Sequence, residues 1–243
     1  MTGMEQMTLV KTDVEAEPSE PPAGRDPVGL GAYSFSSEVV MLSDPRGARA
    51  EGIRALRTYI MAQHVDDGRR GLAVCAATEG VGASFTAVNL AVALAQIGVK
   101  VLLVDGDLRH PALEQFIATA NNVTGLRQCL ASEDPLGAPG IQVDVIENLS
   151  VMYSGGSGNN AQELLATENF GILMERCLRD FDLTIVDTPS ASSCADARRI
   201  SNVIGYSLIV ARRNESFVSD ISALANQLTE DRAKIVGTVM TEA

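Results

Sequence analysis

Residues Ala77-Thr78-Glu79-Gly80-Val81-Gly82-Ala83-Ser84-Phe85 form the most informative segment of this chain. The segment follows a short apolar run, residues 72–76, that is typical of a buried strand. It precedes residues 85–97, whose apolar side chains recur with helical spacing. A strand, a glycine-rich turn and a helix in this order frame a phosphate-binding loop, in which backbone N–H groups at a helix N-terminus hold an anion. The segment therefore predicts either a nucleotide site or a plain tight turn.

The segment departs from the phosphate-loop pattern G-x-x-x-x-G-K-[ST] at two positions. Gly82 and Ser84 match, but Ala77 stands in place of the first glycine and Ala83 in place of the lysine. That lysine normally reaches the outer phosphates, and the hydroxyl after it binds magnesium. The loop thus keeps its backbone groups and its hydroxyl but lacks its cation. The predicted nucleotide-binding residues are Glu79, Gly80, Val81, Gly82, Ala83, Ser84 and Phe85.

The composition indicates a single α/β domain. Of 243 residues, 46% are hydrophobic and 4% aromatic, which suffices for one sizeable core. Residues 1–31 are rich in Glu, Pro, Gly and Ser and are predicted to be a disordered tail, so the folded domain is expected over residues 32–243. Because no run of about 18 apolar residues occurs, no direct membrane insertion is expected. The formal net charge of −12 argues against nonspecific binding to nucleic acid, which needs clustered cations.

Alternating apolar and amphipathic segments predict the elements of the domain. Strands are expected at residues 72–76, 99–104, 148–152, 183–186, 206–211 and 235–240. Helices are expected at residues 47–63, 85–97, 111–117, 125–131, 162–165, 170–178 and 219–228. Buried strands separated by helices predict a mainly parallel sheet with helices on both faces. Ligands of such sheets bind at the carboxyl ends of the strands.

Aspartates follow two further predicted strands. Asp105 and Asp107 come after residues 99–104, and Asp187 comes after residues 183–186. One aspartate after a strand is usually a turn former, but three at the edge that carries the loop favour a site for Mg²⁺ and phosphates. Ser84, Asp107 and Asp187 are the predicted ligands of the ion. Asp105, if it lies slightly further out, would accept a proton from a hydroxyl nucleophile, although spacing alone does not assign roles among the carboxylates.

Two motifs resemble those of a known family, the cytoplasmic domains of bacterial tyrosine autokinases that regulate capsule and exopolysaccharide synthesis. Residues 101–111, VLLVDGDLRHP, resemble the second acidic motif of that family, and residues 183–189, LTIVDTP, resemble the third. The resemblance spans residues 47–241, and its wider relatives are the septum-site and plasmid-partition ATPases. It implies a P-loop fold, ATP or ADP with Mg²⁺ as ligands, tyrosine kinase activity, and catalytic roles for Asp105, Asp107 and Arg109.

The predicted helix at residues 47–63 carries a separate match. Glu51-x-x-Arg54-x-x-Arg57 resembles the family's signature of subunit contacts in a ring, so the resemblance implies a homo-oligomer. Three-residue spacing places the three side chains along one helix face. The alternative is a solvated charged face with an internal ion pair. The resemblance further implies a cytoplasmic protein, peripheral to the inner membrane through the cytoplasmic end of a membrane polysaccharide co-polymerase.

Two departures from the family affect catalysis more than fold. Ala83 removes the lysine that neutralises charge on the transferred phosphoryl group, and Thr241 stands where relatives usually place an asparagine that reads adenine. Arg109 is the expected substitute for the missing charge, with Arg212 and Arg213 as alternatives after a strand at the same edge. Three functions stay open: an ATP-binding kinase-like regulator, a catalytically inactive pseudokinase that acts as an oligomerising scaffold, and a positioning ATPase of the partition type.

Overall fold

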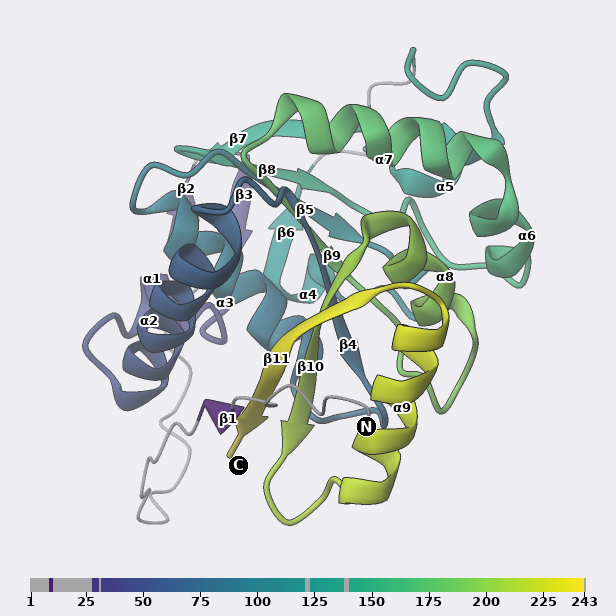
Figure 1. Ribbon diagram of the computed structural model, residues 1–243. Helices are drawn as coiled ribbons and strands as arrows, with labels where there is room; N and C mark the ends of the chain where they lie inside the picture. The colour runs from purple at the N-terminus through teal and green to yellow at the C-terminus, as the bar shows by residue number, and fades with distance from the viewer. Residues whose placement is uncertain (1–8, 11–27, 31, 121–122, 138–139, 243) are drawn as a thin grey trace.

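The computed structural model describes residues 9–10, 28–30, 32–120, 123–137 and 140–242. Its main sheet consists of β1 (Leu9–Val10), β4 (Gly71–Ala76), β5 (Val101–Asp105), β7 (Gln142–Ile146), β8 (Leu149–Met152), β9 (Leu183–Asp187), β10 (Tyr206–Arg212) and β11 (Lys234–Thr241). The strand order is β1-β11-β10-β4-β9-β5-β8-β7, and only the edge pair β7 with β8 is antiparallel (Figure 1). The predicted mainly parallel sheet is confirmed.

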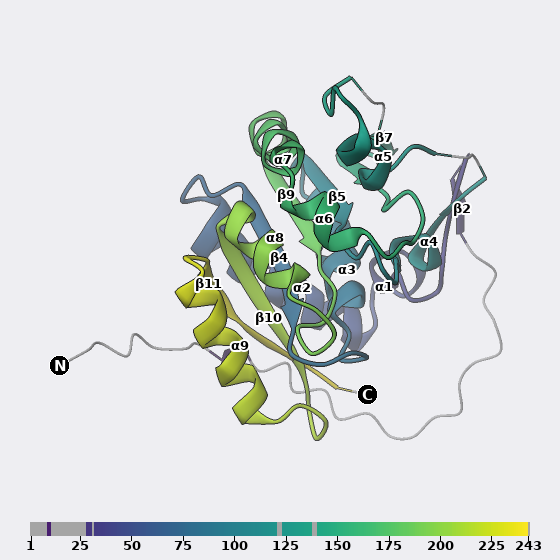
Figure 2. The same cartoon turned by 90° about the vertical axis from the view of Figure 1, so that its right-hand side faces the viewer.

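Helices cover both faces of this sheet, as Figure 2 shows in the view along its edge. One face carries α1 (Val40–Ser43), α2 (Ala48–Ile60), α3 (Ala83–Ala95) and α4 (Leu113–Phe116). The other face carries α5 (Leu126–Ala131), α6 (Ala161–Ala166), α7 (Glu168–Asp180), α8 (Asp196–Ile204) and α9 (Val218–Glu230). In β4, Leu72 and Val74 join the first core, while Ala73 and Cys75 join the second. This alternation follows from the two-residue period of a strand with both faces buried.

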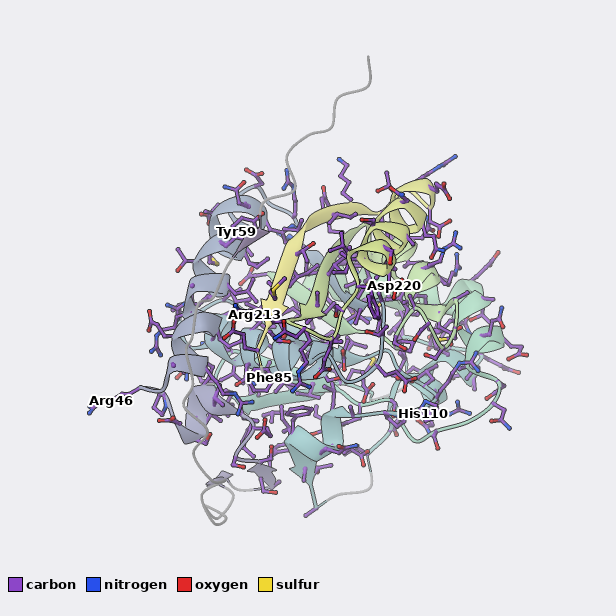
Figure 3. The ribbon with its side chains drawn as sticks, turned by 90° about the horizontal axis from the view of Figure 1, so that it is seen from below. Arg46, Tyr59, Phe85, His110, Arg213 and Asp220 are labelled. Atoms are coloured by element: carbon purple, nitrogen blue, oxygen red, sulfur yellow. The ribbon has the colours of Figure 1, made fainter. Side chains whose placement is uncertain are left out.

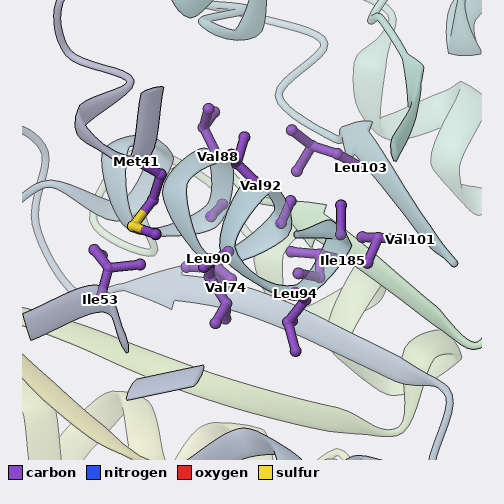
Figure 4. Close-up of a cluster of buried hydrophobic side chains, with 14 of the residues drawn as sticks. Met41, Ile53, Val74, Val88, Leu90, Val92, Leu94, Val101, Leu103 and Ile185 are labelled. Carbon is purple, nitrogen blue, oxygen red and sulfur yellow. The ribbon is translucent and has the colours of Figure 1, made fainter. Parts of the chain in front are cut away.

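Helix α3 lies at the centre of the first core. Its residues from Thr86 to Ala95 are all buried, because the helix is enclosed between the sheet and α2. Figure 4 shows Val88, Leu90, Val92 and Leu94 pointing outward from α3 in several directions into surrounding apolar side chains. A helix that is apolar on all sides gains most of its stability from such burial. Its N-terminus is thereby fixed against the end of β4.

Four regions differ from the sequence prediction. A small antiparallel sheet, β2 (Val28–Leu30), β3 (Tyr33–Phe35) and β6 (Ile117–Thr119), was not expected, and Ile117 begins a strand instead of ending a helix. Helix α1, strand β7 and helix α8 were also not expected. The predicted disordered tail, residues 1–31, lies mostly outside the described residues, and its described parts are β1 and β2.

The predicted helix at residues 47–63 continues slightly further than expected, through a π-helical turn at Met61–Val65. This wider turn contains His64, which is fully buried. Its Nε2 lies 2.8 Å from the carbonyl oxygen of Gly71, and its ring meets that of Tyr206 edge to face at 4.9 Å. Burial lowers the pKa of His64; the Gly71 contact opposes this effect, and the nearby charge of Arg69 reinforces it. The folded chain therefore holds His64 neutral.

A buried neutral histidine makes stability depend on pH. Below the ordinary pKa of 6.5, the unfolded chain takes up a proton at His64 while the folded chain does not, so stability falls as the pH falls. We expect His64→Gln to remove up to about 2 kcal/mol of the stability loss between pH 7 and pH 5. Urea unfolding of both proteins at pH 7, 6 and 5 measures this difference. Parallel pH profiles of the two proteins would contradict the prediction.

Candidate functional site

The carboxyl ends of β4, β5 and β9 bring the predicted site residues to one edge of the sheet. Asp105 pairs in register with Asp187, and Asp187 pairs with Val74, two residues before the end of β4. The loop 77–82 leaves this edge and enters α3 at Ala83. Figure 3 views the molecule from below, the side toward which β10 and β11 point, and shows Phe85 near the middle of this end. The phosphate loop and the acidic motifs are therefore neighbours.

The loop depends on its two glycines. Gly80 and Gly82 have φ of 75° and 89°, a region that side chains with a Cβ rarely adopt. Gly82 precedes the first helical residue, and its carbonyl oxygen accepts the backbone N–H of Thr86 at 2.9 Å. Helix α3 therefore starts one or two residues earlier than predicted, at Ala83. The free N–H groups of its first turn lie at the end of the loop.

Two loop carbonyls are held by side chains from neighbouring strands. Arg212 Nη1 donates to the carbonyl oxygen of Gly80 at 3.1 Å, and the Thr241 hydroxyl donates to that of Val81 at 2.7 Å. In a trans peptide unit the C=O and the following N–H point in opposite directions. The N–H groups of Val81 and Gly82 therefore point away from β10 and β11. The loop has the conformation expected of an anion cradle, with N–H groups on its inner side.

Of the predicted metal ligands, Asp187 has the surroundings that best fit a cation. Its side chain is 1% exposed, and within the described part of the chain its Oδ1 is buried with no hydrogen-bond partner. Burial raises its pKa to about 7; a hydrogen bond from Ser84 lowers the pKa in part, and the charge of Asp107 raises it further. An orphaned carboxylate oxygen beside a hydroxyl group needs a proton or a cation. Mg²⁺, held with Ser84, fits this need.

Asp105 lies deeper than the sequence suggested. It is the last residue of β5 and has no exposed surface, so it does not lie further out than the other aspartates; a role in taking a proton from a nucleophile stays a prediction. Its carboxylate accepts the backbone N–H groups of Asp107, Ala112 and Leu113 at 3.1–3.2 Å. Burial raises its pKa well above the ordinary value, and the charge of Asp187 adds to this rise. Asp105 therefore anchors the loop after β5.

Asp107 is only partly buried and shapes the same loop. Its Oδ1 accepts the backbone N–H groups of Arg109 and His110 at 3.0 and 2.8 Å. In addition to burial, the charge of Asp107 raises the pKa of both Asp105 and Asp187, but the three aspartates form no metal cage alone. Over the ranges that the structure describes, no three His, Cys, Asp or Glu side chains are grouped to hold a metal ion. Magnesium at this edge would depend on one or two carboxylates, a hydroxyl and phosphate oxygens, its usual ligands beside nucleotides.

Arg109 points to a partner other than the loop. Its Nε donates to Asp196 at 2.7 Å, at the start of α8, and Asp196 is 3% exposed. The hydrogen bond with Asp196 raises the pKa of Arg109 above its ordinary value. A charge pair with one buried partner is costly to break, since the buried carboxylate would lose its counterion. Arg109 therefore joins the second acidic motif to α8, and the structure does not favour it as the substitute for the loop lysine.

Comparison with known proteins agrees with this geometry. Residues 70–230 match the family model described as an AAA domain. The chain is 31% identical over 202 residues to the tyrosine-protein kinase YwqD of Bacillus subtilis (strain 168), which covers 83% of this chain and 84% of the relative. It is 30% identical over 176 residues to the tyrosine-protein kinase CpsD of Streptococcus pneumoniae serotype 4, covering 72% and 77%.

The chain belongs to the bacterial tyrosine kinase family. The kinase domain of the Escherichia coli tyrosine kinase ETK has the same fold, with a TM-score of 0.76 and 29% identity over 84% of this chain and 80% of that one. The resemblance inferred from the acidic motifs is thereby confirmed. In this member of the tyrosine kinase family, Ala83 occupies the first turn of α3, at the position of the P-loop lysine.

The segment that resembles the E-x-x-R-x-x-R signature of the family lies on α2. Glu51 is largely exposed and forms an ion pair with Arg54 at 2.7 Å, and Arg54 also donates to the carbonyl oxygen of Pro45 at 2.7 Å. Arg57 turns back toward α3 and lies 3.4 Å from the carbonyl oxygen of Ala93. The internal ion pair that the sequence left open as an alternative is present. Subunit contact through this face stays a prediction.

Proposed function

We propose that this chain is a nucleotide-binding, tyrosine-kinase-like regulator of exopolysaccharide or capsule polymerisation and export. The observation that carries the proposal is the buried, unpartnered Oδ1 of Asp187 beside Ser84, at the start of the helix that follows the phosphate loop. Burial of such an oxygen costs free energy unless a ligand binds to it. Membership of the bacterial tyrosine kinase family supports ATP or ADP with Mg²⁺ as that ligand.

Each residue of the site has a distinct role in this proposal. The N–H groups of the loop and of the first turn of α3 bind the phosphates, because the helix dipole and free donors attract anions there. Ser84, Asp187 and Asp107 would hold Mg²⁺, which when bound neutralises charge on the phosphate oxygens. Asp105 positions the backbone that carries Asp107. The chain's own contribution is thus mainly positioning, the usual role of the protein in phosphoryl transfer.

The partner in this proposal is the cytoplasmic end of a membrane polysaccharide co-polymerase, and the location is the cytoplasm at the inner membrane. The family resemblance of the acidic motifs supports both. None of the helices in the described ranges combines the length and apolar character needed to cross a bilayer. Recruitment of the purified chain to vesicles that contain the co-polymerase, compared with vesicles that lack it, would test the partner directly.

Calorimetric titration with Mg-ATP and Mg-ADP tests the nucleotide site. We expect saturable binding that weakens when EDTA removes Mg²⁺. Incubation with Mg-ATP followed by mass spectrometry for phosphotyrosine, on the chain and on the co-polymerase, then tests the kinase activity. Absence of saturable binding to either nucleotide would refute the nucleotide site. Binding without formation of phosphotyrosine would support the nucleotide site but refute the kinase activity.

Ala83 favours a second candidate function, a noncatalytic scaffold that keeps the fold and assembles through α2. Under this function the signature on α2 matters more than the carboxylates of the site.

Substitution of the α2 signature tests this scaffold. We expect the triple variant Glu51→Ala, Arg54→Ala, Arg57→Ala to lose homo-oligomers, because the charged side chains that would meet a neighbour are gone. Analytical ultracentrifugation measures the change. The double variant Arg176→Ala, Asp180→Ala removes an exposed ion pair of similar geometry on α7 and serves as the control. Equal sedimentation of the triple variant and the control would contradict assembly through α2.

A further inference from the structure

The phosphate loop of this chain lacks its own cation, yet one side chain from a distant strand reaches it. Val210 of β10 pairs in register with Ala76, the last residue of β4. Arg212 follows Val210 by two residues in a parallel strand, so it lies beside the beginning of the loop. Its Nη1 donates to the carbonyl oxygen of Gly80 at 3.1 Å. A guanidinium group is thus attached to the glycine turn itself.

The charge of Arg212 is only weakly compensated. Its Nε is buried and forms no hydrogen bond within the described ranges, although Glu215 Oε1 lies 3.3 Å away. The Glu215 side chain is 54% exposed, and ion pairs with exposed carboxylates contribute little. The Gly80 carbonyl therefore lies against a guanidinium group whose positive charge is largely retained.

The other arginines near this edge are held by different groups. Arg109 is paired with the buried carboxylate of Asp196, as described above. Arg213 is paired with Glu242 at 2.6 Å. Arg212, in contrast, contacts the phosphate loop directly through the Gly80 carbonyl.

We propose that Arg212 supplies the positive charge that Ala83 does not: its guanidinium group, anchored on the Gly80 carbonyl at the outer side of the loop, attracts the phosphates of the nucleotide across the loop and polarises the peptide unit whose N–H, on Val81, faces them. This inference rests on the nucleotide site proposed above. Arg212 acts as a charge that β10 places behind the loop, whereas the usual lysine extends from the first turn of the helix. The position of the charge changes from the helix to the neighbouring strand.

Calorimetric titration of Mg-ATP tests this role of Arg212. We expect Arg212→Ala to weaken binding about tenfold, the effect of losing one unit charge close to the phosphates in a partly buried site. Arg212→Lys retains the charge and is expected to keep most of the affinity. Arg46→Ala removes the same charge from an exposed residue that Figure 3 shows pointing away from the molecule, and is expected to leave the affinity within twofold of the wild type.

The double variant Ala83→Lys, Arg212→Ala separates charge from loop support. If Arg212 acts through its charge, lysine at position 83 restores the lost affinity; if Arg212 only supports the Gly80 carbonyl, it does not, and the inference is rejected. Equal affinities of the wild type and Arg212→Ala would also overturn it while leaving the nucleotide site intact. A wild type that binds no Mg-ATP would refute the site and this inference together. Thermal unfolding of each variant confirms that the fold is kept.

Discussion

Replacement of Ala83 by lysine is expected to raise the rate of Mg-ATP hydrolysis about hundredfold. Residue 83 begins α3 and is only partly buried, so a long side chain there can extend over the loop. A fixed positive charge at this point stabilises the charge that develops on the transferred phosphoryl group, and one such group is typically worth 10²–10³ in rate. Single-turnover hydrolysis measured on the wild type and on Ala83→Lys gives the comparison.

The matched control for this experiment is Ala83→Met. Methionine has a length similar to that of lysine and a high helix propensity, but carries no charge. An equal gain in both variants would show that side-chain length alone produces the effect, and no gain in either would contradict the assignment of position 83 to the phosphate site. Because Arg212 supplies charge from the opposite side in the proposed site, the gain should be larger in the Arg212→Ala background.

Asp187→Asn is expected to affect binding and stability in opposite directions. Asparagine has nearly the same shape but no charge, so Mg²⁺ loses a carboxylate ligand, and we expect Mg-ATP affinity to fall about hundredfold. The free protein should become more stable. The pKa of Asp187 is raised from 3.8 to about 7 in the folded chain, so the folded chain holds a proton at Asp187 more tightly than the unfolded chain does. The stability that this proton provides is fully present below pH 3.8 and is lost as the pH rises through 7.

The gain in stability should therefore be largest above pH 7, where Asp187 is ionised and lies beside Asp105 in a buried environment. We expect it to be on the order of 2 kcal/mol at pH 8, since an uncompensated buried charge is removed. Urea unfolding at pH 8 and pH 5, without nucleotide or metal, measures the difference. A variant that is less stable than the wild type at pH 8 would show that Asp187 is compensated in the folded chain.

The long strands of this fold could be predicted from the sequence because each is a largely apolar run. β4, β5, β9, β10 and β11 begin and end within two residues of the predicted limits. The small sheet of β2, β3 and β6 has three-residue strands, which are too short to show a period. Its partners are far apart in the chain, so pairing of Phe35 with Ile117 depends on tertiary contacts that no local pattern contains.

The edge of the sheet that carries the site could be predicted from the sequence, but the burial and the partners of each side chain could not. Spacing located Asp105, Asp107 and Asp187 at neighbouring strand ends, which the register of β5 and β9 confirms. A shift of one residue in the end of β5 was enough to place Asp105 inside the sheet instead of further out. Spacing also could not show that Arg109 is already paired with Asp196. Selecting Arg212 as the source of the missing positive charge requires knowing which nearby arginines are already paired with carboxylates.

The two hydrogen bonds on the loop carbonyls have a consequence for the order of folding. They join residues 132 and 160 positions apart in the chain. The loop segment leaves the ribosome long before β10 and β11, and contacts at such separations form late because chain closure opposes them. The anion cradle is therefore completed only when the last strands dock. A nucleotide that binds the completed cradle would select fully assembled molecules and shift the folding equilibrium toward them.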